Sequence, residues 1–70
     1  MRYTISYYYG VGDRVTRHVN VADSLSRAQD LAIVIRRKYR RHGPVTIWNE
    51  DRPVLGDDEI ARLDPATLTE

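Results

Sequence analysis

Residues 23–44, DSLSRAQDLAIVIRRKYRRHGP, contain the signal that decides the fold. Apolar side chains recur there at three- and four-residue steps, which places them on one face of an α-helix. The sequence therefore predicts one long helix over about residues 24–42. The residues of the expected core-facing stripe are Leu25, Ala28, Leu31, Ala32, Ile35 and Tyr39.

Both ends of this helix carry stop signals. Asp23 is the expected N-cap, because its carboxylate can accept from the free N–H groups of the first turn, and Ser24 is the alternative cap. Gly43 is expected to end the helix in the left-handed conformation, and Pro44 cannot continue it.

The residues before the helix predict a β-hairpin. Residues 2–9 and 14–21 are rich in Tyr, Thr, Ile and Val, and the glycine-containing segment 10–13 reads as a tight turn between them. Side chains alternate between the two faces of a strand. The expected core-facing residues are Tyr3, Ile5, Tyr7 and Tyr9 of the first strand and Val15, Val19 and Val21 of the second.

The residues after the helix predict two short strands, 45–48 and 53–55, and a short helix over about residues 58–63. Asp64-Pro65 restarts a turn that could extend through Leu68. The predicted architecture is α+β, ββαββ(α), in one small domain over residues 1–70. A mostly antiparallel sheet of three or four strands would pack on the long helix.

Composition limits how this domain can be stabilised. A chain of 70 residues buries about 60% of its unfolded surface, and its stability is marginal without help. It has no cysteine and only two histidines, so disulfides are excluded and a structural zinc site is disfavoured. We therefore expect a homodimer or another protein partner, in the cytoplasm. Arginine outnumbers lysine ten to one, which is typical of GC-rich bacterial or bacteriophage genomes.

Charge is divided unevenly along the chain. Residues 1–48 carry nine Arg and Lys against three Asp, a balance of +6, whereas residues 49–70 carry two Arg against seven acids, a balance of −5. The basic end of the long helix can contact nucleic-acid phosphates, or it can pair with the acidic segment. The candidate nucleic-acid contacts are Arg27, Arg37, Lys38 and Arg41.

A single long helix covers only one face of a sheet, so the other face is a second candidate surface. Aromatic and arginine side chains on an open sheet suit a protein interface, or stacking of single-stranded nucleic acid, and Trp48 could instead pack in the core. The residues expected on this face are Thr4, Ser6, Tyr8, Arg14, Thr16, His18 and Trp48.

The middle of the helix is apolar on more than one side. Ile33 and Val34 lie off the predicted core stripe. They are either ordinary exposed apolar residues or residues that a second subunit or the C-terminal segment covers. The candidate protein-interface residues are then Ile33, Val34, Tyr8 and Trp48.

The sequence contains no catalytic, cofactor-binding or metal-binding pattern. Gly10-Val11-Gly12 lacks the third glycine and the following helix of a dinucleotide motif, and residues 57–59 lack the spacing of a calcium loop. The sequence thus favours a small non-enzymatic protein-binding module that self-associates, with a nucleic-acid-binding protein as the alternative. No membrane, cofactor or small-molecule partner is expected.

Overall fold

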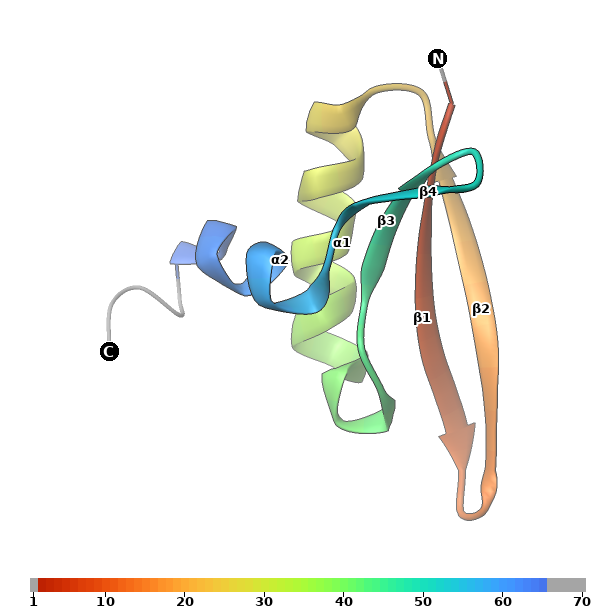
Figure 1. Ribbon diagram of the computed structural model, residues 1–70. Coiled ribbons are helices and arrows are strands. Elements are labelled where there is room, and N and C mark those ends of the chain that lie inside the picture. The colour runs from red at the N-terminus through yellow and green to blue at the C-terminus, as the bar shows by residue number, and fades with distance from the viewer. Residues whose placement is uncertain (1, 66–70) are drawn as a thin grey trace.

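The computed structural model describes residues 2–65 of the chain. Its four strands form one antiparallel sheet in the order β2-β1-β3-β4. The helices lie on one side of this sheet, and no other described element covers the opposite face (Figure 1). The predicted α+β fold, a sheet packed on one long helix, is therefore confirmed. The elements in chain order are β1 (Tyr3–Val11), β2 (Arg14–Ala22), α1 (Leu25–Tyr39), the 3₁₀ turn η1 (Arg40–His42), β3 (Thr46–Asn49), β4 (Arg52–Leu55) and α2 (Asp57–Leu63).

The hairpin turn is shorter than the sequence suggested. Val11 pairs with Arg14, so only Gly12 and Asp13 lie outside the strands. Gly12 has a φ of 63°, the positive value that a two-residue hairpin turn needs and that glycine adopts without steric cost. The hairpin extends beyond the end of α1 (Figure 1). Its far half pairs only within itself, since β3 pairs with β1 only from Tyr3 to Ser6.

The core lies between the sheet and the two helices. It is formed by one cluster of buried apolar side chains, three of which are alanines, so its volume is small. Ile5, Ile47 and Ile60 are fully buried, and they connect the sheet to α2. The buried residues are Ile5, Ala22, Ala28, Ala32, Ile35, Val45, Ile47 and Ile60.

The start of α1 corrects one prediction. The N-cap is Ser24, whose Oγ accepts a hydrogen bond of 3.2 Å from the backbone N–H of Arg27. Asp23, the expected cap, is exposed one residue earlier. Both residue types suit a cap, and the backbone at Ser24 is extended (φ −147°, ψ 159°), as a cap requires.

The end of the helical segment corrects another prediction. Gly43 has a positive φ as predicted, but its φ of 157° and ψ of 177° lie outside the left-handed helical region. Residues with a side chain rarely adopt this φ. A β-carbon at this position would lie 2.7 Å from Cδ2 and 3.0 Å from Cγ of Tyr8. Glycine is therefore required both by the dihedral angle and by the close approach of the Tyr8 ring.

The helix α2 begins at Asp57, one residue before its predicted start, and packs against α1. Ile60 is fully buried, whereas Leu63, the other half of its predicted apolar stripe, is 42% exposed. The Asp57 carboxylate accepts a hydrogen bond of 3.0 Å from the backbone N–H of Val45 and so fixes α2 beside β3. The predicted extension through Leu68 lies outside the described residues.

Candidate functional site

The open face of the sheet is built from residues that the strand register places in rows. Directly opposite residues of antiparallel strands share a face. One row runs from Val21 through Thr4 and Trp48 to Pro53, and the next contains Val19, Ser6 and Thr46. Arg17 and Tyr8 form a third row, and Val15 lies opposite Gly10 in a fourth. We call the set Tyr8, Val15, Arg17, Val19, Val21 and Trp48 the open-face surface.

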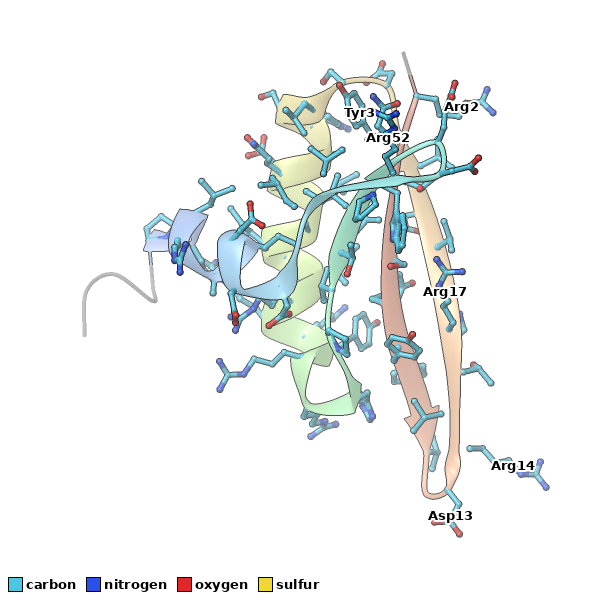
Figure 2. All side chains as sticks on the ribbon, viewed as in Figure 1. Arg2, Tyr3, Asp13, Arg14, Arg17 and Arg52 are labelled. Atoms are coloured by element: carbon cyan, nitrogen blue, oxygen red, sulfur yellow. The ribbon has the colours of Figure 1, made fainter. Side chains whose placement is uncertain are left out.

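Trp48 is held in place at the centre of this surface. Its indole Nε1 donates a hydrogen bond of 2.8 Å to Oγ of Ser6, which is buried and in turn donates at 3.5 Å to the carbonyl oxygen of Thr46. The guanidinium carbon of Arg17 lies 5.9 Å from the Trp48 ring centroid, within cation–π distance. Figure 2 shows Arg17 on β2, well away from the helices. The indole is thus fixed against the sheet and capped by a cation.

The valines of β2 overturn a prediction. Val15, Val19 and Val21 were expected in the core, yet they are 42%, 48% and 58% exposed on the open face. The hairpin register causes this, because a two-residue turn pairs odd-numbered residues of β1 with even-numbered residues of β2. The odd-numbered valines therefore lie on the face opposite Ile5.

The same register moves three residues off the predicted open face. Arg14, Thr16 and His18 pair with Val11, Tyr9 and Tyr7, and so lie on the helix side of β2. Of the residues expected on the open face, Thr4, Ser6, Tyr8 and Trp48 do lie there.

On the helix side, His18 belongs to an aromatic cluster. Its ring stacks on Tyr7 at 5.5 Å between centroids, and Tyr7 stacks on Tyr39 of α1 at 5.2 Å. Tyr9 contacts Tyr39 edge-on at 5.0 Å and His42 at 5.5 Å. These ring contacts join the protruding hairpin to the end of α1, which the sequence patterns did not indicate.

The structure separates the two apolar residues in the middle of α1. Ile33 is half-buried and packs against the core cluster that contains Ile60 of α2. Val34 is 58% exposed. The proposed Ile33–Val34 interface therefore divides into one residue that contributes to the core and one that remains on the surface.

Two arginines at the basic end of α1 face carboxylates of the acidic segment. Arg37 donates from Nε to Oδ2 of Asp64 at 2.9 Å and from a terminal nitrogen to Oδ1 at 2.6 Å. The hydrogen bonds that Arg37 donates to Asp64 raise the pKa of Arg37 above its ordinary value, and the negative charge of Asp64 raises it further. The guanidinium of Arg37 therefore stays charged. Arg36 Nε lies 3.3 Å from Oδ1 of Asp57, close enough for an ion pair although their geometry gives no hydrogen bond.

The four candidate nucleic-acid contacts do not form one patch. Arg27 lies in the first turn of α1, about 16 Å along the helix from Lys38. Arg37 is engaged by Asp64. Lys38 and Arg41 are exposed at the far end, where Lys38 lies 5.9 Å from the Tyr39 ring centroid.

A hollow of about 670 Å³ lies beside the open-face surface. It is lined by Arg2, Val21, Ala22, Asp23 and Arg27.

Residues 2–65 contain no group of three or more His, Cys, Asp or Glu that could hold a metal ion. Within the same residues, no helix is both long and apolar enough to cross a membrane.

The chain matches no family model, no curated protein and no solved structure.

Proposed function

We propose that this chain is a small non-enzymatic protein-binding module that docks on a partner through the open-face surface. The observation that carries the proposal is the line of valines on β2, Val15, Val19 and Val21, which are 42–58% exposed on the side away from both helices. Arg17 lies between Val15 and Val19 on this face, and Tyr8 and Trp48 lie beside the valines. Exposed apolar side chains gathered on one face, with polar groups among them, are typical of interaction sites.

The composition of the surface agrees with the centre of a protein interface. Interface cores are rich in Trp, Tyr and Arg and poor in Lys and Glu, and Trp48, Tyr8 and Arg17 are the aromatic and charged members here. The hydrogen bond from Trp48 to Ser6 fixes the indole in advance, so binding would cost little side-chain entropy.

Nucleic-acid binding is the alternative, and it is supported by Tyr8 and Trp48 as stacking platforms. Arg17 is the one cation of the open-face surface, and it already lies over the Trp48 ring. At the basic end of α1, Arg37 is bound to Asp64. Because affinity for nucleic acid depends on many free cations meeting phosphates, these contacts favour a protein partner. A cytoplasmic location is part of the proposal, and the cysteine-free sequence is its support.

The test uses two valines of equal exposure. Val21, on the open face, and Val34, on the outer side of α1, are both 58% exposed. Immobilised wild type, Val21→Lys and Val34→Lys would be used to capture proteins from a lysate of the source organism, with and without nuclease. Each captured protein would then be purified and its affinity for the three chains measured by calorimetry.

We expect a captured protein to bind wild type and Val34→Lys alike, to bind Val21→Lys at least tenfold more weakly, and to survive nuclease treatment. Loss of binding with Val34→Lys but not with Val21→Lys would contradict the proposed surface. Capture that disappears with nuclease would favour the nucleic-acid alternative.

A further inference from the structure

The two edges of the sheet differ in how they are protected against pairing. The β4 edge is four residues long and contains Pro53. Its pairing with β3 is interrupted by a register irregularity between Ile47 and Trp48. Short strands, proline, bulges and charged side chains are the devices that block pairing at an edge. The β2 edge is nine residues long and contains no proline, and it pairs with β1 without interruption from Tyr3–Ala22 to Val11–Arg14. Its charged side chains are Arg14 and Arg17.

The turn determines which backbone groups of β2 point outward. In a two-residue hairpin the residues that flank the turn, Val11 and Arg14, exchange hydrogen bonds, and every second pair after them does the same. The even-numbered residues of β2 are therefore bonded to β1. The N–H and C=O groups of the odd-numbered residues point away from the sheet at the free edge, and these residues are Val15, Arg17, Val19 and Val21.

We propose that the β2 edge binds the β2 edge of a second copy of this chain, antiparallel and centred on His18, so that two sheets of four strands become one of eight. In this register Val15 lies opposite Val21 of the second copy, and Arg17 lies opposite its Val19. All nine residues of β2 are paired, since Arg14 lies opposite Ala22 of the second copy.

The strand is complementary to itself in this register. No two like charges lie directly opposite, because Arg17 faces a valine and Arg14 faces an alanine, and directly opposed like charges would destabilise the pair. On the helix side, Thr16 lies opposite Asn20 of the second copy, a pair of polar side chains able to form hydrogen bonds. A two-fold axis at His18 relates the two strands, as a closed dimer requires.

The helices leave room for this arrangement. α1 packs mainly on β1, and the two β1 strands of the dimer would lie about 14 Å apart, three strand spacings, which exceeds the 8–10 Å between packed helix axes. The dimer would also bring the valines of both copies onto one continuous face, with the two Arg17 side chains at its centre. The inference concerns the edge of the sheet and does not require the proposed partner protein.

Cysteine crosslinking tests the register directly, because the natural chain has no cysteine. At the axis, the two residues at position 18 form a pair without hydrogen bonds, with Cα atoms about 4.5 Å apart, within the range of a disulfide. The two residues at position 19 would be about 7–8 Å apart, and those at position 13 about 34 Å apart.

Under a glutathione redox buffer, His18→Cys should form a disulfide-linked dimer at least tenfold faster than Val19→Cys, and Asp13→Cys should form none. Crosslinking of Val19→Cys at the rate of His18→Cys or faster would overturn the register. Equal crosslinking of all three variants, or of none, would overturn the proposal.

Sedimentation of the natural chain, from micromolar to millimolar concentration, should show conversion of an 8.1 kDa monomer into a dimer. Val19→Pro removes one outward N–H without removing a bond to β1, so it should weaken dimerisation at least tenfold while the circular dichroism spectrum is retained. A natural chain that stays monomeric at millimolar concentration would overturn the proposal whatever the variant does. If the natural chain stays monomeric in sedimentation but Val21→Lys still weakens binding of a captured protein, the dimer is overturned and the proposed function is not. If the natural chain dimerises but captures no protein, the proposed function is overturned and the dimer is not.

Discussion

Ile60→Ala tests whether the short helix α2 is an integral part of the core. Ile60 is 0% exposed and belongs to the same buried cluster as Ile5 and Ile47 of the sheet. Truncating a fully buried isoleucine to alanine removes its transfer free energy and leaves a cavity, at a cost of about 2–5 kcal/mol. A domain of this length has a total unfolding free energy of roughly 4–10 kcal/mol, so the substitution should remove a large fraction of it.

The control lies on the same helix. Leu63 is 42% exposed, so Leu63→Ala should lower the free energy of unfolding by about 1 kcal/mol or less. Both substitutions introduce alanine into α2, so they change helix propensity by similar amounts. Both variants would be measured by urea denaturation followed by far-UV circular dichroism. Equal losses for the two, or a loss below about 1 kcal/mol for Ile60→Ala, would show that α2 does not close the core.

Three further predictions concern single contacts. Ser24→Ala should cost about 0.5–2 kcal/mol by denaturant unfolding and Asp23→Ala much less, since only Ser24 caps α1; the reverse order would restore Asp23 as the cap. Gly43→Ala should cost about 1–3 kcal/mol because of its positive φ and the nearby Tyr ring, whereas Gly12→Asn should be tolerated at a φ of 63° with nothing within 4 Å; equal Tm values for the two variants would contradict this. Arg37→Met should lower the Tm by removing two hydrogen bonds to a carboxylate that is 3% exposed, and an unchanged Tm would show that the pair contributes nothing.

Features that depend on local pattern were predictable from the sequence. The three- and four-residue periodicity defined α1, and the run of β-branched and aromatic residues defined β1 and β2, because these signals depend only on the residues of the element itself. Pairing between the basic end of α1 and the acidic segment was one of the two outcomes that their opposite charges allowed, and the sequence did not decide between it and nucleic-acid binding. Its partners, Asp64 for Arg37 and Asp57 for Arg36, emerged only in three dimensions.

The side of the sheet on which the valines of β2 lie was predicted wrongly, although the sequence contained the information. Any hairpin turn with an even number of residues pairs odd positions with even positions, and the expected turn at residues 10–13 was already of even length. Val19 and Val21 could therefore not share a face with Ile5. Composition suggested a core position for them because valine is usually buried. The type of a residue does not determine which face of the sheet its side chain lies on, since that depends on the strand register.

The covering of Ile33 by the core could not be predicted from periodicity. Its position off the main stripe of α1 shows only that the helix has a second apolar side. What covers that side depends on where α2 docks, and this is set by contacts between distant segments, such as the hydrogen bond from Val45 to Asp57.

The most direct test of the central claim is an NMR titration of the isotope-labelled chain with the captured and purified partner. The methyl groups of Val15, Val19 and Val21 and the indole N–H of Trp48 should show the largest changes in chemical shift, while the methyl groups of Val34 should remain unchanged. Changes centred on Val34 and the basic end of α1, with the valines of β2 unaffected, would contradict the assignment of function to the open face.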